Sequence, residues 1–391
     1  MGKSILLRGA RQLLTLRGPS GVRRGLALQD LSMIEDGSVL IRDGIIVAIG
    51  SSRRIENLSE AKQALEIPVH GKVVMPAFVD AGLNLSINRS NGATNRKKAS
   101  DFYDEAIAVF RSCLHHGTLC AEVKAHAYDG DYESVIPALK QVAKIGHNPL
   151  SITRTWRLES APSPDEEVMS RAQRTLAYLA RHKLVDFVEA WAADFQLDTC
   201  LSFLKTAQAL GIGIKAEWSG AALASLESFP AGVIPTSLRL PLPIDAKAHA
   251  RLVGLPSVLV FSPSEEVVAT EARNSGLRAL LDGGAALALS SGYDLRQATS
   301  VSMQMALALA VIRLQLTTEE AICAGTVNAA WGLGIGHRTG TLEVGKQADV
   351  MVLSVGDYRE LARQFGINHV AMIVRQGNLV LNRTKWRPGV P

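Results

Sequence analysis

No run of apolar residues in this 391-residue chain reaches the roughly 18 that a helix needs to span a bilayer, and there is no secretory hydrophobic region. Residues 1–29 carry only positive charges, as a transit peptide would. The runs at 4–7 and 12–16 nevertheless favour short strands separated by a turn. We therefore expect a cytoplasmic protein with no membrane partner.

Cysteine is scarce, and basic charge is neither large nor clustered. The four cysteines lie far apart without the spacing of a metal site, which favours reduced, mostly buried thiols. The net charge is +5, and the positive residues are scattered rather than gathered in a stripe with interleaved aromatic residues. We therefore expect no nucleic-acid partner.

Strand signals are concentrated at both ends of the chain. The N-terminal part holds two alternating apolar runs joined by Asp43-Gly44, a pair that tolerates the positive φ angles of a type I′ hairpin turn. Strand-like runs return after residue 349. We expect segments 1–70 and 341–391 to form one composite domain, a small β-sandwich built from both termini.

Residues 71–340 alternate short apolar runs with helical stretches. Regular βα alternation predicts a parallel sheet, and eight units predict an α/β fold of the (β/α)8 TIM-like barrel type. A doubly wound open sheet is the alternative, but no Gly-x-Gly-x-x-Gly follows a strand where a dinucleotide would bind. The predicted strands are 74–85, 119–124, 150–154, 184–190, 213–217, a sixth near 232–238, 258–261 and 285–290. The predicted helices are 101–115, 133–145, 165–182, 197–210 and one opened by a capping box at 317–320.

Several segments carry a family resemblance. They are GARQLLTLRGP at 9–19, IEDG at 34–37, GTLEVGKQAD at 340–349, DYREL at 357–361 and FGINHV at 365–370. Through them the chain resembles the imidazolonepropionases of the amidohydrolase superfamily over essentially its whole length. The resemblance implies the metal-dependent hydrolase fold, a (β/α)8 barrel with a β-sandwich from both termini. It also implies a hydrolase acting on non-peptide C–N bonds of cyclic amides.

The same resemblance identifies the positions at which that family binds zinc or iron, and none of its usual ligands is present. The paired histidines of the first barrel strand fall on Gly82 and Asn84, the fifth-strand histidine on Glu217, and the eighth-strand aspartate on Gly292. No histidine stands near 235–236, where the sixth-strand ligand is expected. Zinc requires about four strong N, O or S ligands. We therefore expect no metal cofactor.

The family's loop after the first strand is shortened here to 86–98. Active sites of such barrels lie at the carboxyl ends of the strands. Glu217, Lys124 and Glu122 are the candidate catalytic residues there, as a metal-independent acid–base pair. The alternative, which we favour, is that they are structural ion pairs filling the space of the metal. The predicted pocket residues are Gly82, Asn84, His126, Arg154, Glu189, Gly292 and Asp294.

Three functional hypotheses follow. The leading one is a catalytically degenerate, metal-free imidazolonepropionase-like pseudoenzyme that binds a small cyclic amide or similar ligand. The second is an active hydrolase whose metal-independent or weakly metal-dependent site uses Glu217, Lys124 and Glu122. The third is a structural role, as a homo-oligomer scaffold or as the partner of an active paralogue.

Overall fold

The computed structural model describes residues 4–85, 99–127, 131–146, 149–158, 165–192, 197–218, 233–239, 244, 246–266, 276–294 and 300–384. The predicted loop at 86–98 lies outside the described residues, as does Gly232 at the start of the predicted sixth strand. No described helix is both long enough and apolar enough to cross a membrane.

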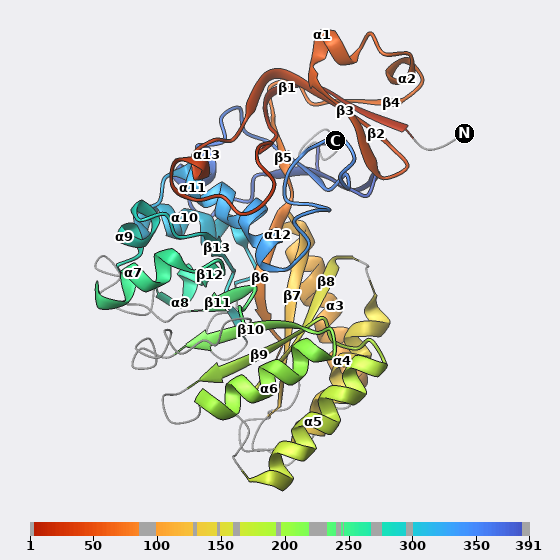
Figure 1. Ribbon diagram of the computed structural model, residues 1–391. Coiled ribbons are helices and arrows are strands. Elements are labelled where there is room, and N and C mark those ends of the chain that lie inside the picture. The colour runs from red at the N-terminus through yellow and green to blue at the C-terminus, as the bar shows by residue number, and fades with distance from the viewer. Residues whose placement is uncertain are drawn as a thin grey trace.

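A curled sheet of parallel strands occupies the middle of the chain (Figure 1). The hydrogen-bonded order is β13-β12-β11-β10-β9-β8-β7-β6-β14. Strand β14 follows β13 after three residues and pairs with β6, so the end of the sheet returns to its beginning. The predicted α/β, TIM-like fold is thereby confirmed. The strands are β6 (Phe78–Asn84), β7 (Thr118–Ala127), β8 (Ser151–Leu158), β9 (Phe187–Ala192), β10 (Gly213–Trp218), β11 (Ser237–Arg239), β12 (Val258–Phe261), β13 (Leu287–Leu289) and β14 (Tyr293–Asp294).

Helices cover the outer face of this sheet (Figure 1). Their starts follow local capping chemistry. The Asp165 side chain accepts hydrogen bonds from two backbone N–H groups at the start of α5, and Thr317 with Glu320 forms the predicted capping box of α11. The helices are α3 (Ala99–His115), α4 (Val135–Ile145) after a 3₁₀ turn (Tyr132–Ser134), α5 (Glu166–Arg181), α6 (Leu197–Ala209), α7 (Ala246–Gly254), α8 (Pro263–Glu266), α9 (Leu277–Asp282), α10 (Met303–Leu314), α11 (Thr318–Cys323), a π turn (Ala324–Asn328) and α12 (Ala329–Gly332).

A second, mixed sheet joins both ends of the chain at the top of Figure 1. The predicted hairpin is present, and Asp43 and Gly44 have φ angles of 51° and 86°. Hydrogen bonds join all eight strands in one sheet, so the two-layer sandwich and its domain boundaries stay predictions. The elements are β1 (Ser4–Leu14), β2 (Met33–Arg42), β3 (Ile45–Ser51), β4 (Leu65–Pro68), β5 (Val73–Pro76), β15 (Val350–Leu353), β16 (Val370–Arg375) and β17 (Asn378–Asn382), with a 3₁₀ turn (Gly25–Leu28) and short helices α1 (Ser52–Ile55), α2 (Ser59–Lys62) and α13 (Glu360–Arg363).

Several predicted strand boundaries are wrong. The runs at 4–7 and 12–16 were predicted as two strands separated by a turn, but 4–14 is one strand, β1, with a register shift between Leu7 and Ala10. The run predicted as one strand at 74–85 is divided, because β5 belongs to the terminal sheet and β6 to the barrel. The strand predicted to end at Arg154 continues to Leu158. A continuously apolar run contains no alternation that marks a change of sheet. Polar residues that face the barrel interior resemble loop residues in sequence, so the end of such a strand is also difficult to predict.

The side chain of Asn328 holds the N-terminal segment against the barrel. Its Oδ1 accepts a hydrogen bond from the Arg23 amide at 2.7 Å, and its Nδ2 donates to the carbonyl oxygens of Arg23 at 3.0 Å and Leu287 at 2.8 Å. The side chain is fully buried, so water cannot replace these bonds.

Replacing Asn328 with alanine leaves three buried backbone groups without partners. We expect Asn328→Ala to lower the free energy of unfolding by about 3 kcal/mol, since each unsatisfied buried group costs roughly 1–3 kcal/mol. Urea unfolding followed by circular dichroism measures the change. Asn57→Ala is the matched control, because the exposed Asn57 side chain donates only to the Arg53 carbonyl. A loss no greater than that of the control would contradict the assignment.

Candidate functional site

Two lysine–glutamate pairs fill the middle of the barrel. The Lys124 Nζ donates hydrogen bonds to both carboxylate oxygens of Glu189, at 2.6 and 2.7 Å. The Lys215 Nζ donates to Glu122 Oε1 at 2.7 Å, and the Thr155 hydroxyl donates to the same oxygen at 2.5 Å. Lys124 and Glu122 also approach to 3.9 Å. All four charged side chains are almost completely buried, and their charges balance.

A second set of charged side chains, more exposed than the first, continues this network toward the carboxyl ends of the strands. Arg157 Nη1 lies 2.9 Å from Glu217 Oε2, and Arg239 Nε lies 4.0 Å from the same oxygen. Arg157 Nε is also 3.9 Å from Glu189 Oε2. Exposed fractions of the side chains rise from 3% at Glu189 to 19% at Glu217. Exposure therefore increases from the charged centre toward these residues, which we call the outer group of the network.

The surrounding cations keep the Glu189 carboxylate charged. Burial disfavours the charged form of Glu189, but Lys124 and Arg157 outweigh it and hold the pKa of that carboxyl well below its usual range. Burial lowers the pKa of Lys215 from its ordinary value, although Glu122 opposes the change. A carboxylate with so low a pKa is a poor proton acceptor at neutral pH.

Below the charged layer the barrel is closed by apolar side chains. They come from four barrel strands, β6, β7, β12 and β13, and cluster with Ala329 and Ala330 of α12 and with Leu333 directly after it. The charged groups therefore lie between an apolar floor and the carboxyl ends of the strands. The strand residues of this floor are Val79, Ala81, Cys120, Val258, Val260 and Ala288.

The strand-one motif does not present its polar residues on one face. A register shift lies between Asp80 and Leu83, where Asp80 pairs with Ala121 but Asn84 pairs with Lys124. Asn84 therefore faces inward with Lys124, whereas Asp80 shares the opposite face with Ala121. The Asp80 Oδ1 accepts hydrogen bonds from the backbone N–H of Gly82 at 3.1 Å and of Ser291 at 3.0 Å.

Most predicted site residues lie together inside the barrel. Glu122 and Lys124 pair within the buried network and Glu217 lies in its outer group, while Gly82 faces it. Strand register also places Asn84 beside Lys124, Asp294 beside Asn84, and His126 beside Arg157. Their roles in catalysis or binding stay predictions.

Arg154 was predicted in the pocket, and this placement is wrong. Its guanidinium forms two 3.0 Å bonds with the Asp186 carboxylate and one with the Lys183 carbonyl, before the start of β9. Thr155 faces inward, so its neighbour Arg154 faces outward. The inward position at the end of β8 belongs to Arg157.

Gly292 occupies the turn between β13 and β14, with a φ of 67°. A Cβ atom there would lie 2.7 Å from Ser264 Oγ and 2.8 Å from Ser262 Cβ. Both distances are shorter than van der Waals contact allows. The position of the family's eighth-strand aspartate is therefore closed to any side chain without local rearrangement.

Sequence reasoning missed Arg157, Lys215 and Arg239. A usable signal existed for two of them, because Lys215 precedes the candidate Glu217 by two residues and Arg157 follows Thr155 by two. Such spacing places side chains on one face of a strand. Arg239 is the last residue of a strand of only three residues, which has too few positions to show alternation.

The residues present do not fit the metal that the resemblance implies. Within the described ranges, no three His, Cys, Asp or Glu side chains are grouped so that they could hold a metal ion. An ideal Cβ on Gly82 would lie 3.7 Å from Lys124 Cε. The ammonium arm of Lys124 thus borders the space of the family's first histidine, and it would repel a divalent cation.

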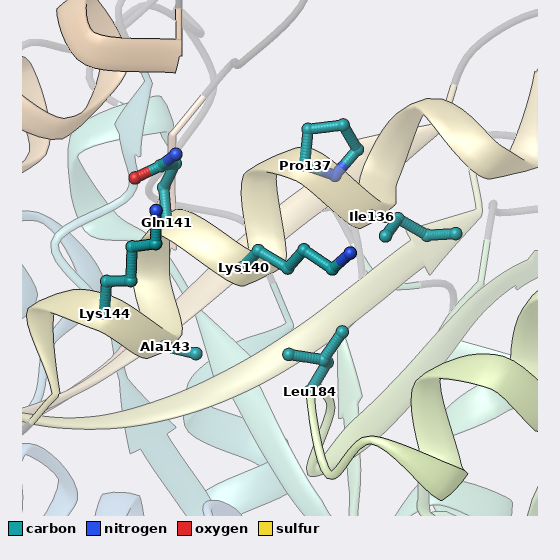
Figure 2. A pocket seen from close by; sticks show the side chains of 7 residues that line it. All are labelled: Ile136, Pro137, Lys140, Gln141, Ala143, Lys144 and Leu184. Carbon is teal, nitrogen blue, oxygen red and sulfur yellow. The ribbon is translucent and has the colours of Figure 1, made fainter.

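A hollow on the outside of the molecule is distinct from this site. It measures about 510 Å³ and is lined by one face of α4 together with Leu184. Figure 2 shows Lys140 and Lys144 of α4 on this surface, above Leu184. The Lys140 ammonium also lies 5.4 Å from the centre of the Tyr178 ring. The hollow lies on the helical layer, away from the barrel interior.

Comparison with known proteins identifies related sequences over nearly the full length. A model of the amidohydrolase family matches residues 294–380. The imidazolonepropionase of Chloroflexus aggregans is 27% identical over 428 residues, covering 96% of this chain and 98% of that protein. The imidazolonepropionase of Solibacter usitatus is 28% identical over 431 residues, covering 98% and 100%.

Solved structures support the fold. The ochratoxinase of A. niger superposes with a TM-score of 0.72 at 15% identity and covers 97% of this chain and 96% of its own. A molinate hydrolase gives a TM-score of 0.70 at 15% identity, with 97% and 95% covered. At this identity the likeness shows the fold alone.

Removing Glu189 leaves the Lys124 ammonium buried beside a neutral group. We expect Glu189→Gln to lower the free energy of unfolding by about 3–5 kcal/mol, as is typical when one partner of a buried pair is removed. The double variant Lys124→Met/Glu189→Leu removes both charges and should recover most of this loss. Urea unfolding of wild type, Lys124→Met, Glu189→Leu and the double variant measures the coupling between the two side chains. Additive losses would contradict a paired role.

The buried Asp80 gives a pH dependence of stability. Burial raises the pKa of this carboxyl to about 6, although the bonds from Ser291 and Gly82 oppose the change. The folded state therefore holds the proton more tightly than the unfolded state, so this residue's contribution to stability falls as pH rises from about 4 to about 6.

Asp80→Asn keeps the acceptor oxygen and abolishes the titration. The stability of this variant relative to wild type should rise by up to about 3 kcal/mol between pH 4 and pH 7, at about 1.4 kcal/mol per pKa unit. Urea unfolding at several pH values measures the difference between the two proteins, in which other titrating groups cancel. A difference that does not change with pH would show that Asp80 does not titrate in this range.

Proposed function

We propose that this chain is a catalytically degenerate, metal-free hydrolase homologue. It is a member of the amidohydrolase superfamily and is imidazolonepropionase-like. In this proposal the barrel binds a small molecule and does not open a ring. The superfamily fold is retained, and its strand ends still converge on one interior space. What differs is the chemistry of the side chains in that space.

The Lys124–Glu189 pair beside Gly82 is the observation that supports this proposal most strongly. Metal-dependent hydrolysis depends on a cation that lowers the pKa of bound water toward about 7. Here a lysine ammonium, held by two hydrogen bonds, borders the space that a histidine at this position would enter. An ammonium group can neutralise nearby carboxylates, but it cannot coordinate water as a metal does.

The acid–base alternative is less well supported by the geometry. A general base must reach the proton of a water or substrate and be free to accept it. Glu122 accepts hydrogen bonds from Lys215 and Thr155, and Glu217 is paired with Arg157. Accepting a proton would break these pairs, which are the better explanation of both carboxylates.

A cytoplasmic location is part of the same proposal. All four cysteines are free and buried, as expected of a protein from a reducing compartment. A homo-oligomer or a complex with an active paralogue is an alternative that co-purification would reveal.

Metal analysis and an activity assay test the proposal together. Protein purified from cells supplied with zinc and iron should contain far less than one metal ion per chain. Its melting temperature should not change with a chelator or with added Zn²⁺, because the donors for tight binding are missing. Imidazolonepropionate should not be hydrolysed above the background rate. The Chloroflexus aggregans relative serves as the positive control.

One tightly bound ion per chain together with ring opening would refute the proposal. Ring opening without metal would instead favour the acid–base alternative. In that case Glu217→Gln should abolish the activity, whereas Glu343→Gln, a change far from the barrel strands in sequence, should leave it intact.

A further inference from the structure

Asn84 carries a buried polar group without a hydrogen bond. Only 6% of the residue is exposed, and its Oδ1 atom has no hydrogen-bond partner. Strand register places the side chain inside the barrel beside Lys124 of β7 and Asp294 of β14. Leaving a buried acceptor unsatisfied costs roughly 1–3 kcal/mol. Such a group in a native protein indicates that something else supplies the bond.

The charged side chains around Asn84 already have partners within the protein. Lys124 is neutralised by Glu189 through two short hydrogen bonds, and Asp294 has a polar interaction of its own. On the other side of Gly82, the hydroxyl groups of Ser290 and Ser262 share a hydrogen bond of 2.6 Å. An ionic ligand would disturb this balance, so the surroundings favour a neutral polar molecule.

Gly82 brings no side chain of its own into the interior next to Asn84. The glycine faces the interior, and an ideal Cβ on it would have only ordinary contacts, 3.7 Å to Lys124 Cε and 3.7 Å to Ser290 Cβ. Asn84 lies two residues further along the strand on the same face, nearer its carboxyl end. The carboxamide is therefore directed into the interior above this glycine.

We propose that Asn84 binds the amide edge of a small neutral ligand. A carboxamide offers an acceptor and a donor side by side. Its best complement is a group with a neighbouring N–H and C=O on one edge, such as a lactam or a primary carboxamide. The proposal rests on the proposed function, because the bound amide must persist without hydrolysis. Asn84 is then a specificity residue at a position where the related enzymes place a metal-binding histidine.

The test uses two lactams that differ in one donor, 2-piperidone and N-methyl-2-piperidone. Binding is measured by ligand-observed NMR on the full chain. Wild type should bind 2-piperidone at least tenfold more tightly than its N-methyl form, and Asn84→Ala should bring the two affinities together. Asn57→Ala, an exposed change outside the barrel, should leave both affinities unchanged.

Thermal stability gives a second, independent measurement. If Asn84 is unpartnered in the free protein, Asn84→Ala should melt at the same or a higher temperature than wild type. A lowered melting temperature would indicate a structural hydrogen bond and overturn the proposal. Equal binding of both lactams to wild type would also overturn it. So would a crystal soaked in 2-piperidone that shows an ordered water only at Asn84.

The assay separates this proposal from the previous one. Mass spectrometry of the 2-piperidone mixture detects 5-aminopentanoate if the ring opens. Ring opening with Asn84-dependent binding would refute catalytic degeneracy and leave the role of Asn84 intact. Selective binding without ring opening would support both proposals.

Discussion

The two hydrogen bonds that Lys124 donates to Glu189 determine which groups the barrel interior can accommodate. Moving either charge out of water costs several kcal/mol, and only short, well-directed contacts to the other repay that cost. The pair joins β7 to β9, and the companion pair of Lys215 and Glu122 joins β10 to β7. If either lysine moved away, a buried carboxylate would lose its counter-charge. The network is therefore fixed in place once the strands have paired.

The layers of the barrel explain why these charges are tolerated at that depth. The apolar floor excludes water from below, which strengthens each electrostatic contact above it. Arg157 then links Glu189 to Glu217 in the outer group, so that charge alternates in sign from the centre outward. A divalent cation in this space would lie among two ammonium and two guanidinium groups, and the three carboxylates there are already paired with these cations. Among the residues that the structure describes, this alternation of charges includes no group of three side chains that could hold a metal ion.

Much of the fold could be predicted from the sequence because its signals are local. The turn at Asp43-Gly44 and the capping box at Thr317–Glu320 each depend on a few neighbouring residues, and both are present. The alternation of strands and helices also follows from local periodicity. The division of the run at 73–84 between two sheets could not be predicted, since both parts are buried and apolar.

The site was less predictable because its composition depends on pairing across strands. Glu122, Lys124, Glu189 and Glu217 could be chosen from the ends of the predicted strands. Their pairing with one another and with Lys215 and Arg157 follows from strand register, which the sequence does not show. These side chains do form ion pairs, and their role in structure or catalysis stays a prediction. Arg154 was misplaced because the predicted strand stopped before the inward-facing Arg157, four residues short of its end.

The register shift in β6 shows how one local irregularity separates two roles within a five-residue motif. Regular alternation would place Asp80, Gly82 and Asn84 on a single face. The shift instead turns Asp80 to the face of Ala121, where it binds the backbone of Ser291 and so ties β6 to the segment after β13. Gly82 and Asn84 keep the inward face beside Lys124. Structural closure of the sheet and the chemistry of the interior therefore depend on different residues of the motif, and one can change while the other is retained.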